Sequence, residues 1–435
     1  MHESRKKLFR RLCPLGIWLL CSSAMWAQTP APNQNELIER LLQRVDQLEK
    51  RVAELESGRP VAQAAEPPRA EVPAARGPAP TVLNPLGPGA GGEHDHGTLL
   101  DASQTYPSLK LSGFSDINFA ASQQPGTKSG FNEGQFVLHI SSALSSRVTY
   151  FGEISMTART DAGLGSPPAT GFNVEVERSF IRFDQSDHFK LSFGRFHTPI
   201  SYWNTAFHHG SWLQTTASRP ASIAFGGSFI PLHFLGALGE GAASAGGLNV
   251  NYYSGIGNGR SSVLSRDGDF GDVNNNKAWL AGAFLKPDWL YGFQVGGAVY
   301  RDKIDATGKP EAREWIENAH IVWTRENPEI IAEFFNVSHA APGSGVAVTS
   351  QAWYAQIGWR LPFADLWKPY YRYEYIHIPQ ADLVYRGTVA SSRGSTLGVR
   401  YDISNYAAFK FEYRNQSAFG VKNFNAFFAQ TDFTF

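Results

Sequence analysis

Cysteine is nearly absent from this 435-residue sequence, which has only Cys13 and Cys21, both close to the N-terminus. If the N-terminal segment is removed on export, the mature chain has no disulfide, thiolate metal site or cysteine nucleophile. Net charge is also absent, because 39 Lys and Arg residues balance 39 Asp and Glu residues. This balance excludes a polybasic nucleic-acid binder and an acidic disordered tail.

Long hydrophobic runs are missing from residues 108–435, so no segment there can cross a bilayer as a helix. Methionine is scarce as well, with only Met156 beyond residue 25. By contrast, 13% of the residues are aromatic and 42 are glycine. This composition is unlike that of a soluble α/β enzyme and is typical of a large β-protein.

The first 27 residues have the features of an export signal. A basic stretch from Arg5 to Arg11 precedes an apolar stretch from Leu12 to Leu20, and Ala24 and Ala27 offer small residues for cleavage. The apolar stretch is too short for a membrane-spanning helix. We therefore predict a cleaved signal peptide over residues 1–27, and an uncleaved anchor is the alternative.

Residues 35–56 repeat in sevens and predict a short coiled coil. The apolar seam consists of Ile38, Leu41, Val45, Leu48, Val52 and Leu55 at the a and d positions. The flanking positions carry charges that can pair between parallel helices, namely Arg44 and Arg51 at g and Glu49 and Glu56 at e. Two Arg-h-x-x-h-Glu stretches, where h is apolar, resemble the pattern of trimeric coiled coils. A homotrimer is therefore favoured over a dimer, and a surface helix packed on its own domain is the third possibility.

Residues 57–107 are rich in Ala, Pro and Gly without hydrophobic periodicity, which predicts a flexible linker. His94-Asp95-His96 lies within it, but two histidines on a flexible segment lack a fixed third ligand. We expect no metal and no cofactor.

Residues 108–435 are punctuated by stretches of alternating character. Leu397, Val399, Tyr401 and Ile403 alternate with polar residues, as do Phe409, Phe411 and Tyr413, and likewise Tyr371, Tyr373 and Tyr375. Each such strand has one apolar, strongly aromatic face and one charged face, which is typical of a transmembrane β-barrel. A soluble sandwich or propeller is the alternative.

Such stretches number about sixteen. They begin near Leu109, Glu133, Ser146, Asn173, His188, Ser228, Ala245, Lys277, Tyr291, Arg313, Pro328, Ser350, Trp367, Ser392, Tyr406 and Asn423. Long connections, including 120–132, 198–227 and 417–422, alternate with short ones. This asymmetry predicts an all-β outer-membrane barrel with both termini in the periplasm.

The chain ends on Phe433 and Phe435, which alternate with Asp432 and Thr434. This ending resembles the closing strand that the barrel-assembly machinery recognises in outer-membrane proteins. The parity of the last strand places both phenylalanines on the lipid-facing side.

The combination of export signal, coiled coil, linker and barrel resembles the trimeric bacterial outer-membrane porins, most nearly the group of phosphate-selective porins O and P. The stretch Lys190–Ile200 is similar to a strand and Thr-Pro turn of that group. The third long connection lacks the many Lys and Arg residues that phosphate selectivity would require. The resemblance implies a homotrimer embedded in outer-membrane lipid.

A sixteen-strand barrel is wide enough to hold water, which predicts passive diffusion of small hydrophilic solutes or ions. The longest connection, 198–227, is the expected constriction, with Tyr202, Trp203, His208, His209, Trp212 and Arg219 as its candidate residues. The two tryptophans could instead belong to the aromatic girdle, and the histidines could simply be solvated.

Strand parity assigns a set of charged side chains to the pore. They are Lys110, Arg178, Arg182, Lys190, Glu333, Arg372, Glu374, Arg400, Lys410, Glu412 and Arg414. Their basic excess suggests weak anion preference.

Two other functional classes remain open at this point. An outer-membrane hydrolase could pair His139, His320 or His377 with a serine, but no nucleophile elbow is present. A structural anchor could use its coiled coil to bind a periplasmic or cell-wall partner. We expect a non-enzymatic porin.

Overall fold

A computed structural model describes residues 106–158, 171–224, 229–260, 263–264, 274–304, 311–418 and 420–435. The predicted signal peptide and coiled coil lie outside these residues, as does the predicted linker up to residue 105, so all three stay predictions. Within the described ranges, no helix has the length and apolarity that crossing a membrane requires.

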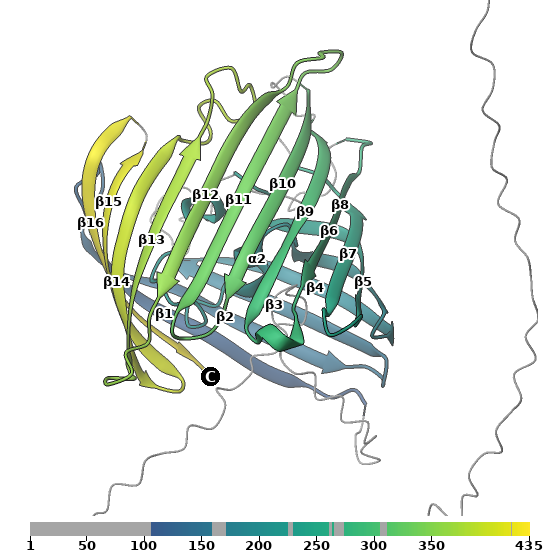
Figure 1. Ribbon diagram of the computed structural model, residues 1–435, viewed down its shortest axis with the longest axis horizontal. Helices are drawn as coiled ribbons and strands as arrows, with labels where there is room; N and C mark the ends of the chain where they lie inside the picture. Colours follow the sequence, from purple (N-terminus) through teal and green to yellow (C-terminus); the bar gives the residue numbers. More distant parts are fainter. Residues whose placement is uncertain are drawn as a thin grey trace, which may run out of the picture. The chain divides into compact units, whose positions relative to one another are not determined.

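Sixteen antiparallel strands form a closed barrel, in which each strand pairs with its neighbours in sequence and β1 pairs with β16 (Figure 1). The first eight strands are β1 (Lys110–Ser122), β2 (Gly130–Ala143), β3 (Val148–Ala158), β4 (Phe172–Ser186), β5 (Phe189–His197), β6 (His233–Ala243), β7 (Val250–Gly257) and β8 (Ala278–Leu285). The others are β9 (Phe293–Ile304), β10 (Ala312–Trp323), β11 (Glu329–Ala340), β12 (Val348–Gly358), β13 (Trp367–His377), β14 (Ser392–Ser404), β15 (Ala407–Ala418) and β16 (Val421–Thr434). Three short helical segments, α2 (Tyr202–Ala206), η1 (Ala221–Ile223) and η2 (Asp288–Leu290), lie in connections.

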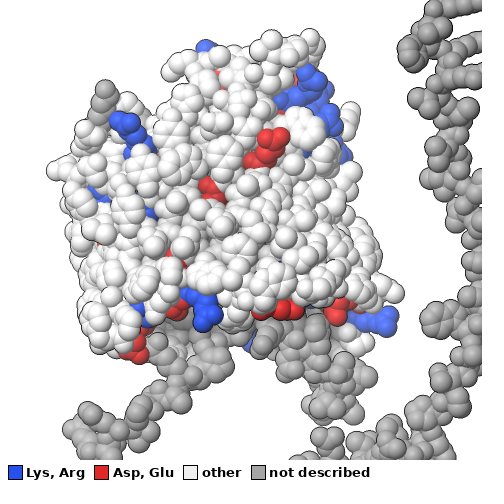
Figure 2. Space-filling model, viewed as in Figure 1, with Lys and Arg blue, Asp and Glu red and all other residues white. Residues whose placement is uncertain are grey.

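The alternation of the sequence becomes the two faces of the barrel wall. In β15, Tyr413 is 50% exposed on the outside, whereas the neighbouring Glu412 is 1% exposed on the inside. Leu397 of β14 and Tyr371 of β13 are likewise exposed, and Figure 2 shows an outer face composed mainly of uncharged residues. The barrel prediction is therefore confirmed, and the sandwich and propeller alternatives are wrong.

The predicted strands all exist, but several boundaries differ. The sixth strand begins at His233 rather than near Ser228, so the connection before it covers residues 198–232. The predicted long connections 120–132 and 417–422 are shorter, because β1 extends to Ser122 and β15 to Ala418. At the ends of β1 and β15 the strand ladder continues beyond the predicted limits, because cross-strand hydrogen bonds come from the backbone and do not require an apolar face.

The barrel closes where the chain ends. The N–H of Gly113 donates to the carbonyl of Phe435 at 2.9 Å, and the N–H of Phe435 donates to the carbonyl of Gly113 at 3.1 Å. Phe435 is 55% exposed on the outer face and stacks on Phe136. The parity predicted for the last strand is confirmed, and both ends of the barrel lie at the same rim.

Candidate functional site

The segment between β5 and β6, residues 198–232, folds into the barrel and is described except for residues 225–228. Its helix α2 begins after Ser201, whose side chain accepts a hydrogen bond from the N–H of Asn204. The Asn204 amide donates to the carbonyls of Thr198 (3.1 Å) and Leu232 (2.9 Å). One side chain thus connects the two ends of the segment and fixes where it enters and leaves the wall.

Glu333 of β11 binds the start of α2. Its carboxylate accepts hydrogen bonds from the backbone N–H groups of Tyr202 and Trp203, both at 2.9 Å, and from the Ser201 hydroxyl at 3.1 Å. Tyr354 and Asn318 donate to the same carboxylate. A buried carboxylate on the wall therefore satisfies the N–H groups that a helix start leaves without partners.

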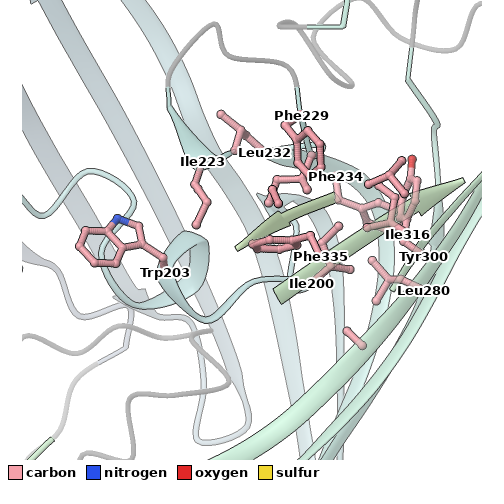
Figure 3. Close-up of a cluster of buried hydrophobic side chains, with 14 of the residues drawn as sticks. Ile200, Trp203, Ile223, Phe229, Leu232, Phe234, Leu280, Tyr300, Ile316 and Phe335 are labelled. Atoms are coloured by element: carbon pink, nitrogen blue, oxygen red, sulfur yellow. The ribbon is translucent and has the colours of Figure 1, made fainter. Parts of the chain in front are cut away.

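One side of the lumen is filled by an apolar cluster. Ile200, Trp203, Ile223, Phe229 and Leu232 from the segment are all nearly inaccessible to solvent. They belong to one buried cluster with inward-facing side chains of β6 and β8–β11 (Figure 3), namely Phe234, Leu280, Tyr300, Ile316 and Phe335. Trp203 therefore does not belong to an aromatic girdle at the membrane surface, and Trp212, which is 8% exposed, does not either.

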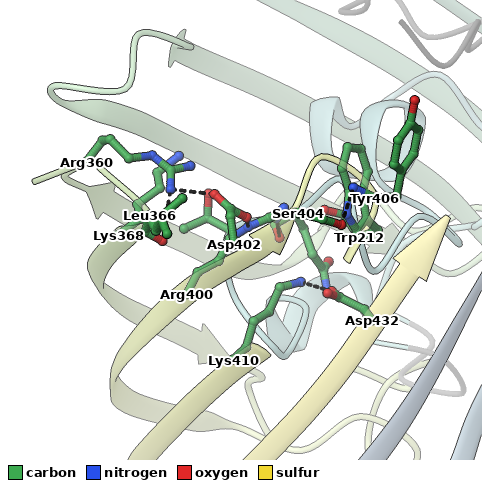
Figure 4. Close-up of polar contacts among 12 residues, drawn as sticks. Trp212, Arg360, Leu366, Lys368, Arg400, Asp402, Ser404, Tyr406, Lys410 and Asp432 are labelled. Carbon is green, nitrogen blue, oxygen red and sulfur yellow. Dashed lines mark hydrogen bonds and ion pairs between the residues drawn. The ribbon is translucent and has the colours of Figure 1, made fainter. Parts of the chain in front are cut away.

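Charged side chains of β13, β14 and β15 hold the middle of the segment. Arg372 donates to the carbonyl of Ser218 at 2.8 Å, Arg400 to the carbonyl of Trp212 at 2.7 Å, and Lys410 to the carbonyl of Ser211 at 2.5 Å. Figure 4 shows Arg400 and Lys410 with their acidic partners Asp402 and Asp432.

Two acidic side chains complete this row. Glu412 accepts from the N–H of Ala217 at 3.1 Å, and Glu374 accepts from the N–H of Ala221 at 3.0 Å. The segment thus contacts both the β6–β11 side and the β13–β15 side of the wall, so it crosses the lumen.

A cavity of about 960 Å³ remains beside the segment. Its lining comes from β1–β4, β6, β13–β16, the connection between β13 and β14, and the segment itself. The charged residues at its surface are Asp116, Glu175, Glu177, Glu374, Arg219, Arg393 and Arg414. The open space is therefore off-centre, and the charges at its surface are close to balance.

Four histidines meet at one edge of this cavity. His197 ends β5, His233 begins β6 directly opposite in register, and His208 and His209 follow α2. His208 and His209 are each 4% exposed, so the interpretation of them as solvated loop histidines is wrong. Burial, together with His197, His209 and Arg219 nearby, lowers the pKa of the His208 imidazole well below its usual range.

Glu177 of β4 lies against this cluster, with one carboxylate oxygen 3.1 Å from His209 Nε2 and 2.8 Å from His233 Nε2. Neither Glu177 nor His197 and His233 were predicted from the sequence, because they lie on three different strands. Gly194 allows the close approach of β5 to β4, since its φ is +142° and a Cβ there would meet the carbonyl oxygen of Ser179 at 2.2 Å.

The other predicted pore residues divide into paired and peripheral groups. Arg178 is ion-paired with Glu153, Arg182 with Asp184 at 2.8 Å, and Arg414 with Glu412 at 2.7 Å. Lys110 is the first residue of β1 and is exposed at the rim, and Lys190 is half-buried in β5. Among these five, only Arg414 lines the cavity.

The three histidines considered for a hydrolase lie apart from one another. His139 is 3.3 Å from Glu153, and His320 is 2.9 Å from the Gln294 amide. His377, the last residue of β13, is exposed on the outside.

No family model matches the chain, and no curated protein matches it. The loop L8 deletion mutant of OmpT, an outer membrane protein of Vibrio cholerae, is similar over 76% of this chain and 100% of its own, with 13% identity and a TM-score of 0.51. The in-vitro folded OmpT matches over 76% and 98%, with 12% identity and a TM-score of 0.51. OmpF of Salmonella typhi, solved with daunomycin, matches over 76% and 98%, with 13% identity and a TM-score of 0.51. At these identities the likeness shows the fold: this chain is a closed, sixteen-strand antiparallel β-barrel.

Proposed function

We propose that the chain is an outer-membrane porin through which small hydrophilic solutes or ions diffuse passively, with residues 198–232 as its constriction. The observation that carries this proposal is the placement of that segment. It is bound to the wall on both sides of the lumen and leaves a cavity of about 960 Å³ beside it, with charged residues of both signs in the lining. A loop folded into a wide barrel narrows the path and sets which side chains a solute meets.

The outer surface supports a location in a membrane. Exposed apolar and aromatic residues such as Phe411, Tyr413 and Leu397 face outward, while the charged residues between them face inward. A closed barrel also leaves no strand edge with unpaired backbone groups, as the hydrocarbon core requires. The common rim of the two barrel ends fits a periplasmic N-terminal arm.

The path through the barrel runs beside β1–β4 and β13–β16, because the apolar cluster fills the β6–β11 side.

Ion pairing weakens the support for an anion preference. Lys368, Arg400 and Lys410 each have an acidic partner within ion-pair distance, so little uncompensated positive charge faces a solute. We therefore expect weak selectivity, and the weak anion preference stays a prediction.

Cysteine labelling tests both the channel and its path, because both natural cysteines lie in the predicted signal peptide. Asn118→Cys and Gln416→Cys place a thiol at the cavity surface, whereas Ala298→Cys on β9 is a matched control within the apolar cluster. In a planar bilayer, a charged thiol reagent should lower the single-channel conductance of the first two variants and leave the control unchanged. A folded wild-type barrel that conducts no ions would contradict the porin proposal, and equal block of all three variants would contradict the path.

The oligomeric state and the alternative function are tested by truncation. Removal of residues 28–107 should leave conductance intact and convert trimers to a weaker assembly, because residues 35–56 form the proposed trimerising coiled coil. If the truncated protein conducts normally but cells lose envelope integrity, the structural anchor is the better description.

A further inference from the structure

The histidine cluster defined above, His197, His208, His209 and His233, brings four imidazoles together at the cavity edge. One ring nitrogen from each lies within 4.8 Å of one from every other. The rings of His197 and His208 are stacked with centroids 3.8 Å apart, and those of His208 and His209 are 4.4 Å apart. Each neutral imidazole offers one nitrogen lone pair, so four rings packed this closely bring four potential metal ligands into one place.

The hydrogen bonds around the cluster orient its rings. Both N–H bonds of the Asn204 amide are used on the carbonyls of Thr198 and Leu232, so its oxygen must accept. His208 Nδ1 lies 2.6 Å from that oxygen and therefore carries the proton. In the neutral ring, Nε2 of His208 then carries the lone pair. This is the arrangement by which proteins fix the tautomer of a metal-binding histidine.

His209 repeats the arrangement. Its Nδ1 lies 3.2 Å from the side-chain oxygen of Gln135 on β2, and its Nε2 points to Glu177. The Glu177 carboxylate also contacts Nε2 of His233 at 2.8 Å. Two imidazole nitrogens and one carboxylate oxygen, all of them potential metal ligands, therefore converge on one place.

We propose that His197, His208, His209 and His233 bind one divalent transition-metal ion, with Glu177 as their carboxylate partner. Imidazole is a ligand for Zn²⁺, Ni²⁺ and Cu²⁺, whereas Mg²⁺ and Ca²⁺ prefer oxygen ligands. With Zn–N bonds of about 2.0–2.1 Å, tetrahedral ligands lie about 3.4 Å apart. Ligand nitrogens that lie 4.8 Å apart therefore have to approach each other by roughly 1.4 Å, which side-chain rotation can supply.

The proposed ion has a route and a structural consequence. Glu177, His208, His209 and His233 line the cavity, so an ion can arrive through it. His197 and His233 belong to the strand ends, whereas His208 and His209 belong to the segment between them. A bound ion would thus cross-link the segment 198–232 to the barrel wall. This inference goes beyond solute diffusion and would stand for a barrel that does not conduct.

The test is Zn²⁺ binding to the untagged, detergent-folded full chain, measured by isothermal titration calorimetry, with Mg²⁺ as the comparison ion. The parent protein of this test carries His94→Ala and His96→Ala, which removes the other pair of histidines close in sequence. Every variant below is made in this parent. We expect one Zn²⁺ per chain and no Mg²⁺ binding. His208→Gln with His209→Gln should weaken Zn²⁺ binding at least a hundredfold, and Gln135→Ala should weaken it about tenfold or more.

The matched control is His188→Gln with His377→Gln, which removes two exposed histidines of the barrel and should change nothing. Circular dichroism verifies that each variant is folded, and if the double variant does not fold, His209→Gln and Gln135→Ala carry the test. Co²⁺ should give the visible absorption of a tetrahedral nitrogen site in the parent only. Zn²⁺ binding that is absent, or that is equal in the parent and the cluster variants, would overturn the proposal.

Discussion

Glu333→Gln is the substitution that most directly tests how the segment 198–232 is held. In the wild type, one oxygen of Glu333 accepts from Ser201, from the N–H of Trp203 and from Tyr354, and the other accepts from the N–H of Tyr202 and from Asn318. Glutamine has the same shape but replaces one oxygen with an NH₂ donor. Whichever way the amide lies, one backbone N–H at the start of α2 then faces a donor.

The expected size follows from the cost of such a mismatch. A buried donor left without an acceptor costs about 1–3 kcal/mol, and hydrogen bonds to a charged acceptor are stronger than those to a neutral one. We therefore expect the docked segment to lose about 2 kcal/mol, which corresponds to a roughly 30-fold increase in its undocked population. The barrel strands, whose backbone hydrogen bonds are untouched, should keep most of their stability.

Hydrogen exchange of the peptide containing Tyr202 and Trp203 measures this population, because exchange there requires the segment to open. Glu317→Gln is the matched control, since Glu317 lies on the outer face of β10 and accepts from Asn336 at 3.1 Å. Exchange in this peptide should rise about 30-fold in the first variant and stay unchanged in the second. Equal exchange in Glu333→Gln and wild type, with both folded, would refute the assignment of Glu333 as the main anchor of α2.

Three further predictions concern other parts of the chain. Burial raises the pKa of Asp382, but His339 at 3.0 Å, Ser350 and the N–H of Tyr385 more than offset this, so the net pKa is lowered. Its charge therefore stabilises the connection between β13 and β14 above about pH 3.9 and is lost as pH falls through the lowered pKa. Asp382→Asn should destabilise that connection by about 1–3 kcal/mol at pH 7, and by less as the pH falls. Limited proteolysis measures this loss of stability, and an equal loss at pH 3 and pH 7 would contradict the role of the charge. Phe435→Ala should reduce barrel assembly in cells several-fold while the purified chain still refolds in detergent, and unimpaired assembly would remove Phe435 as the signal. Leu41→Asp with Leu48→Asp should dissociate the proposed trimer in light scattering, whereas Gln43→Asp, outside the seam, should not.

The strands were predictable because each carries its own signal. The alternation around Phe411 and Leu397 shows, without any partner strand, which side faces outward and which faces inward. The same local parity placed Phe435 correctly on the outer face. Strand ends were less accurate. β1 and β15 pair further than predicted because the neighbouring strand offers hydrogen bonds, whereas β6 begins later than predicted, at His233, because Phe229, Ile230 and Leu232 before it belong to the buried cluster.

The β-barrel and the importance of the longest connection could be predicted from the amino-acid pattern alone, as could the inward direction of Glu333, Arg372, Arg400 and Lys410. What those charges bind depends on the folded barrel, because their partners are backbone groups of a segment more than a hundred residues away in the chain. The histidine cluster was likewise invisible in sequence, since His197 and His233 become neighbours only through the pairing of β5 with β6. Periodicity is a local property that reports which face a side chain occupies, whereas a site depends on which faces meet after the barrel has closed.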